Sequence, residues 1–88
     1  MDSIFGNGGK VFFVGDSVWV LIHVGNKTPK RYHGTIISVV KDDYISTGSV
    51  EIETARGKVV RAPSNKVYDH MPKPFVVEDK LGKFTAWE

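Results

Sequence analysis

The sequence predicts an all-β domain that is folded as a small, strongly bent barrel. Apolar residues alternate with other residues along several short segments, as in Val18, Val20 and Ile22. Turn signals rich in Gly, Asp, Asn or Pro separate these segments about every ten residues, which is the spacing typical of small barrels. No helical periodicity extends beyond one turn. Five barrel strands are therefore expected near residues 10–14, 17–23, 31–40, 49–54 and 58–62.

The turns between these strands follow from their residue types. Gly15-Asp16 joins the first two strands, and the segment 25–30, with Gly, Asn and Pro, joins the next two. Arg56-Gly57 is a tight hairpin signal before the last strand. Residues 1–9 contain three glycines and are expected to form a flexible N-terminal arm, in which Ile4 and Phe5 can dock on the body.

After the barrel, which spans residues 10–69, the chain continues into an extension over 70–88. Pro63-Ser64-Asn65 ends the last strand and can cap one helical turn. Two prolines at 72 and 74 make a rigid connector, and Gly82 marks the turn of a C-terminal β-hairpin. Because a two-stranded hairpin is barely stable alone, we expect it to pack on the barrel or on a partner.

The expected core consists of Val18, Val20, Ile36, Ile52 and Val60. Apolar residues also occupy the opposite faces of two strands, because Trp19 and Leu21 alternate with the core residues of one strand, and Ile37 and Val39 lie opposite Ile36 in the other. Apolar residues on both faces indicate that both faces are covered. The expected cover is the C-terminal segment with Phe75, Phe84 and a substantially buried Trp87; a homo-oligomer or a partner that binds these residues and Trp19 is the alternative.

Two motifs, at the start of the predicted barrel, resemble those of the SH3-like small barrels of the KOW and Tudor-like groups. Val14-Gly15-Asp16-x-Val18-x-Val20 is similar to their opening strand, and Tyr32-x-Gly34-x-Ile36 to their second. The resemblance covers residues 10–69 and implies an SH3-like five-stranded bent barrel with a one-turn helix before its last strand. Tudor-like readers bind methylated cations with several aromatic side chains. Here Arg56 stands where those readers often place an aromatic residue, which favours the KOW-like alternative of contact with nucleic acid or with polymerase and ribosome surfaces.

Composition limits the function classes. The 88 residues make one domain with 41% hydrophobic residues and a net charge of +2. There is no Cys, no apolar run of the ~20 residues that span a bilayer and no signal-peptide pattern, so we expect a cytoplasmic protein without membrane contact. His23, His33 and His70 lack metal-ligand spacing, and no catalytic set stands out. We expect no enzyme activity, no cofactor and no metal.

The functional hypothesis rests on basic residues in two loop regions, 26–33 and 55–61. Lys and Arg neutralise phosphates, and a tyrosine between them can stack on a base, so these loops predict contact with nucleic acid or a nucleoprotein complex. The candidate residues are Lys27, Lys30, Arg31, Tyr32, Arg56, Lys58 and Arg61. The alternative is a protein-interaction module, or a small inhibitor or accessory protein of the kind that phages encode. It would dock through its apolar outer face or its C-terminal segment, at Trp19, Phe75, Phe84 and Trp87.

Overall fold

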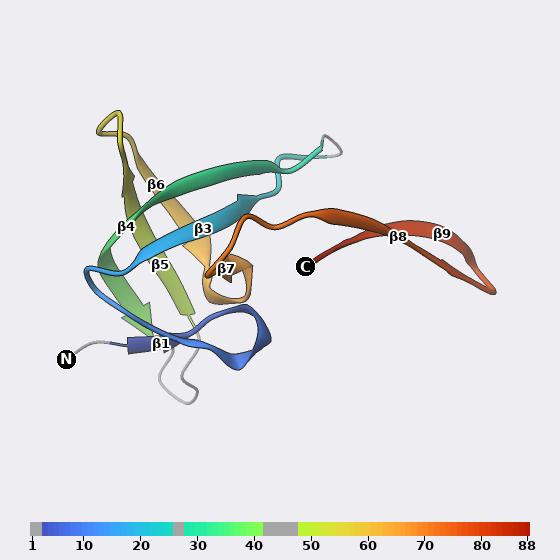
Figure 1. Ribbon diagram of the computed structural model, residues 1–88, viewed down its shortest axis with the longest axis horizontal. Helices are drawn as coiled ribbons and strands as arrows, with labels where there is room; N and C mark the ends of the chain where they lie inside the picture. The colour runs from blue at the N-terminus through green and yellow to red at the C-terminus, as the bar shows by residue number, and fades with distance from the viewer. Residues whose placement is uncertain (1–2, 26–27, 42–47) are drawn as a thin grey trace.

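The computed structural model describes residues 3–25, 28–41 and 48–88, and within these residues all regular elements other than two 3-10 turns are β-strands (Figure 1). The all-β prediction is confirmed. The elements are β1 (Ser3–Phe5), the 3-10 turn η1 (Asn7–Gly9), β2 (Val11–Phe13), β3 (Ser17–Ile22), β4 (Lys30–Lys41), β5 (Gly48–Thr54), β6 (Val59–Pro63), the 3-10 turn η2 (Ser64–Lys66), β7 (Val67–Tyr68), β8 (Pro74–Asp79) and β9 (Gly82–Trp87).

Five strands form one antiparallel sheet in the order β6-β5-β4-β3-β7. The long strand β4 curves across the molecule, and the sheet folds around a single core (Figure 1). Among the described residues, β6 and β7 are the edges of this sheet and do not pair with each other, so the expected closed barrel is not found. The expected strand at 10–14 is also not part of this sheet, because β2 pairs with β1 in a separate two-stranded sheet.

A β-bulge in β4 corrects the facing that the sequence predicted for this strand. Ile36 pairs with Ile52 and Val39 pairs with Val50, but the register shifts between Ile36 and Ser38. The additional residue, Ile37, is 45% exposed, and it returns Val39 to the face that packs against the core. The prediction that Val39 lies opposite Ile36 is therefore wrong, because strict alternation ends at a bulge.

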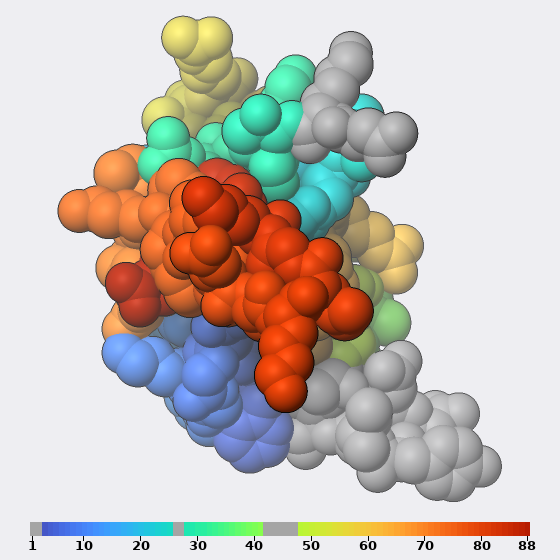
Figure 2. Space-filling view, turned by 90° about the vertical axis from the view of Figure 1, so that its right-hand side faces the viewer, coloured from blue at the N-terminus to red at the C-terminus, as the bar shows by residue number. Residues whose placement is uncertain are grey.

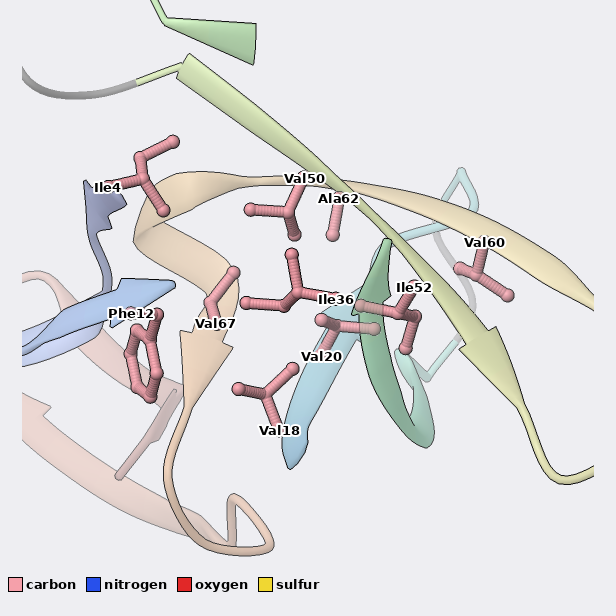
Figure 3. Close-up of a cluster of buried hydrophobic side chains, with 10 residues drawn as sticks. All are labelled: Ile4, Phe12, Val18, Val20, Ile36, Val50, Ile52, Val60, Ala62 and Val67. Atoms are coloured by element: carbon pink, nitrogen blue, oxygen red, sulfur yellow. The ribbon is translucent and has the colours of Figure 1, made fainter. Parts of the chain in front are cut away.

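All five residues predicted for the core are buried, with at most 8% of their surface exposed. Figure 3 shows how they meet side chains that the sequence did not assign to the core, from β1, β2, β5, β6 and β7. These additional members are Ile4, Phe12, Val50, Ala62 and Val67. Ile4 belongs to the segment expected as an arm, and it is 1% exposed because β1 pairs with β2 over the end of the sheet.

The outer face of β3 is covered by the connector rather than by the C-terminal hairpin. Leu21 and Pro72 are fully buried, and Arg31, which pairs with Leu21 across the strands, donates from Nη1 to the carbonyl oxygen of Pro72 at 3.3 Å. The connector therefore crosses this face just after β7 (Figure 1). A backbone pair between Lys73 and Glu88, at 2.8 and 3.1 Å, closes the base of the hairpin.

The hairpin itself, β8 and β9, has the predicted strands, and its two phenylalanine side chains are exposed. It stands away from the five-stranded sheet in Figure 1 and in front of it in Figure 2. Phe75 is 42% exposed and Phe84 is 52% exposed, and Trp87 is only partly buried. Phe75 and Phe84 therefore do not provide the expected cover of β3 and β4 within the chain, whereas Pro72 of the same C-terminal segment is buried and bonded to Arg31. The alternative, that they bind a partner, stays a prediction.

Candidate functional site

An open pocket of about 430 Å³ lies where the first residues of β4 meet the turn between β5 and β6. Its lining combines three basic side chains, one tyrosine and one histidine with small residues. The lining residues are Arg31, Tyr32, His33, Thr54, Ala55, Arg56 and Lys58.

Antiparallel pairing explains why residues from two separate loops meet here. β4 and β5 run in opposite directions with Gly34 beside Thr54, so the beginning of one strand lies next to the end of the other. The turn that follows is closed by hydrogen bonds from Thr54 N to Lys58 O and from Gly57 N to Thr54 O, both 2.9 Å. Gly57 has φ +81°, a conformation that favours glycine and lets the turn bring Arg56 and Lys58 back over β4.

Tyr32 is the aromatic centre of the pocket. It pairs with Val20, so its ring lies on the core side of the sheet, where it is partly buried against the core. The Nζ of Lys58 lies 5.0 Å from the centre of the Tyr32 ring, within cation–π range. Such a contact contributes about 0.5–1 kcal/mol at an exposed site, so a ligand can displace it.

Arg31 approaches the pocket from the opposite face of β4. One of its N–H groups is used by the carbonyl oxygen of Pro72, which fixes the direction of the guanidinium. A guanidinium has five N–H donors, so Arg31 keeps donors for an anion while it is anchored. The pocket thus has one positioned cation and two cations, Arg56 and Lys58, on exposed turn positions.

The structure separates the other predicted contact residues from this pocket. Lys30 is exposed next to Arg31 but does not line the pocket. Arg61 lies farther along β6, where Nε and Nη2 both donate to Ser49 Oγ at 3.2 Å. Lys27 lies outside the described residues. Trp19, predicted as a partner contact, is partly buried and stacks on His33 with ring centres 4.8 Å apart.

A second pocket, of about 500 Å³, continues from the first across the outer face of β4 and β5. His33, Thr54 and Ala55 line both pockets and form their common border. The remaining lining of the second pocket is Ser17, Gly34, Thr35, Ile37 and Glu53.

His33 has a place in the site that the sequence did not specify. The sequence placed it at the end of the basic loop 26–33 without naming it as a contact residue, and in the structure it forms a hydrogen bond of 2.9 Å between Nε2 and Ser17 Oγ and is stacked beside Trp19 at an interplanar angle of 22°. The available signal was strand alternation: His33 and Trp19 both occupy the outward positions of neighbouring strands, which places their rings side by side.

Charged groups away from the pockets form one further cluster. Asp69 forms an ion pair with Lys10 and a 2.6 Å contact with Nδ1 of His70. The hydrogen bond from Lys10, followed by that from His70, lowers the pKa of Asp69 to about 2. This cluster joins the N-terminal segment to the start of the connector. In the described parts of the chain, no three His, Asp or Glu side chains gather as metal ligands would.

Comparison with protein-family models, with curated proteins and with solved structures finds no match to this chain. The assignment of function therefore depends on the two pockets and on the surfaces around them. None of the helical turns in the described residues has the length or the apolar character needed to cross a bilayer.

Proposed function

We propose that the chain is a non-catalytic module that binds nucleic acid, free or within a nucleoprotein complex, through the pocket around Tyr32. The observation that carries this proposal is one pocket lined by Arg31, Arg56 and Lys58 together with Tyr32, in which the Lys58 ammonium lies over the Tyr32 ring. Cations neutralise the phosphate backbone, and an aromatic face accepts a base without regard to its identity.

The concave form of the pocket favours a single strand over a duplex. A base must leave its stack to reach Tyr32, and unpaired bases are free to do so. In the unbound protein Lys58 covers the Tyr32 ring. Binding then exchanges one contact for two, because a base takes the ring face while the Lys58 ammonium moves to a phosphate.

The proposed fold is an SH3-like barrel of the KOW type. The sheet order β6-β5-β4-β3-β7 and the 3-10 turn Ser64–Lys66 between the last two strands of this sheet support it. The Tudor-like alternative, recognition of a methylated cation, is disfavoured because Lys58 already provides the cation over Tyr32 and Arg56 stands beside it.

A titration with labelled single-stranded oligonucleotides at low salt tests the proposal. Replacing Arg56 and Lys58 together by Gln should weaken binding to every sequence and lower the log–log salt slope by about 1.4, since each phosphate contact on a single strand contributes about 0.7. Tyr32→Ala should weaken binding by about 1–3 kcal/mol if the ring stacks on a base.

The matched control removes the same charge from the hairpin by replacing Lys80 and Lys83 with Gln. Both lysines are exposed and lie outside the two pockets, so affinity should change little. Equal losses in the two double variants would show that only net charge matters. If the wild type bound no DNA or RNA at low salt, the proposal would be abandoned.

A protein-interaction module is the second candidate, and the exposed hairpin favours it. Phe75, Val77, Phe84 and Ala86 lie on one face of β8 and β9, and Leu81 at the turn is 98% exposed. Aromatic side chains in such positions are typical anchors for a protein partner. In this case Phe84→Ser would abolish binding to the partner, while Arg56 and Lys58 could be replaced without effect.

A further inference from the structure

We infer that the second pocket holds one base of the bound strand and selects a base with adjacent N–H donors, guanine above all, through Glu53. The inference rests on the proposed function and concerns the pocket that borders the basic one. The two pockets share His33, Thr54 and Ala55, so a strand held by the first pocket continues directly into the second.

The charges of the two pockets decide which part of a nucleotide each one accepts. Three cations line the first pocket, whereas Glu53 is the acidic residue of the second and Lys and Arg are missing from its described lining. A phosphate is repelled by the Glu53 carboxylate. The strand can therefore place its phosphates at Arg31, Arg56 and Lys58 and only an uncharged base beside Glu53.

The rings at the border provide a stacking surface for this base. Trp19 covers one face of His33 and lines neither pocket, whereas His33 lines both. The hydrogen bond between Nε2 and Ser17 Oγ holds the imidazole in place. A base set against the free side of His33 becomes the third ring of a stack, and histidine is among the side chains on which unstacked bases settle.

Glu53 then determines which base is accepted. An ionised carboxylate only accepts hydrogen bonds, and its two oxygens match two neighbouring donors. Guanine presents N1–H and the N2 amino group side by side, cytosine and adenine present one amino group, and thymine and uracil present one N–H between two carbonyl oxygens that repel the carboxylate. The expected order is guanine first, cytosine and adenine next, and thymine or uracil last.

The experiment compares fluorescence-labelled oligothymidylates in which one central position is dG, dC, dA or dT. The wild type should bind the dG oligomer about tenfold more tightly than the all-dT oligomer, within the range that a bidentate contact to a base provides. In Glu53→Gln this ratio should fall below about threefold, because a side-chain amide also donates to thymine.

Glu51→Gln is the matched control, since Glu51 lies on the same strand, carries the same charge and lines neither pocket. It should keep the tenfold ratio. Equal affinity for all four oligomers in the wild type, or an unchanged ratio in Glu53→Gln, would overturn the inference and leave the proposed function standing. Failure of every oligomer to bind would instead remove the proposed function itself.

Discussion

Gly34→Ala is expected to destabilise the domain because the β5 backbone lies against Gly34 of β4 and leaves no room for a Cβ atom. Gly34 is buried and pairs with Val18 on one side and Thr54 on the other. A Cβ atom here would lie 2.5 Å from the carbonyl oxygen of Glu53 and 2.9 Å from its carbonyl carbon. Both are backbone atoms, so the two strands must separate locally. Overpacking of this kind costs about 1–3 kcal/mol.

For a domain of this size, each kcal/mol corresponds to about 4–8 °C in melting temperature, so Gly34→Ala should melt roughly 5–20 °C below the wild type. Thermal unfolding followed by circular dichroism or calorimetry measures this shift. Val40→Ala is the control, because Val40 lies on the same strand and is 47% exposed; its effect should stay within about 0.5 kcal/mol. A Gly34→Ala protein that melts with the wild type would show that β4 and β5 are not in such close contact.

Two further predictions concern the connector and its charges. A chain ending at Lys73 should keep the melting temperature within a few degrees of the full chain. A chain ending at Asp69 lacks Pro72 and should expose Leu21, which should lower the free energy of unfolding by about 1.5–3 kcal/mol and increase the binding of a hydrophobic dye. If both truncated chains lost the same stability, the assignment of Pro72 as the cover of Leu21 would be wrong. The pKa of Asp69 is about 2 in the folded protein, below the ordinary aspartate pKa near 4. The ionised carboxylate therefore stabilises the fold at pH values above about 4, and this contribution is lost as the pH falls from about 4 to 2. The urea concentration at the unfolding midpoint should therefore fall more steeply with falling pH for the wild type than for Asp69→Asn. If both proteins showed the same pH dependence, the contact between Lys10 and Asp69 would not stabilise the fold.

The main sheet could be predicted from sequence wherever local alternation and burial agree. Val18 and Val20 alternate with Trp19 and Leu21 on a strand of regular pairing, so period 2 assigned their faces correctly. The same rule failed at Val39, because a bulge between Ile36 and Ser38 shifts the register and leaves no mark in the order of apolar residues. Ile4 was uncertain for a related reason: the glycines around it predict freedom, whereas its burial depends on pairing with Phe12.

The sequence predicted which two loops meet at the candidate site, but it did not predict the second pocket beside it. Antiparallel hairpins in sequence order place alternate turns at the same end of a sheet, which is why the loops of Arg31 and Arg56 could be assigned to one surface. Arg61 was included for its charge alone, and its contact with Ser49 depends on register. The second pocket depends on the register that places Gly34 beside Thr54 and Thr35 beside Glu53, which sequence spacing does not specify.

A small net charge is compatible with the proposed binding because the relevant field is local. Charges farther away than about 8 Å are largely screened at physiological ionic strength, so a phosphate in the first pocket is affected mainly by Arg31, Arg56 and Lys58. Three such contacts give a log–log salt slope of only about 2 on a single strand. The affinity that persists at high salt must then come from groups that salt does not screen, namely stacking on Tyr32 and His33 and the hydrogen bonds of Glu53. Base selectivity should consequently survive at salt concentrations where much of the total affinity has been lost.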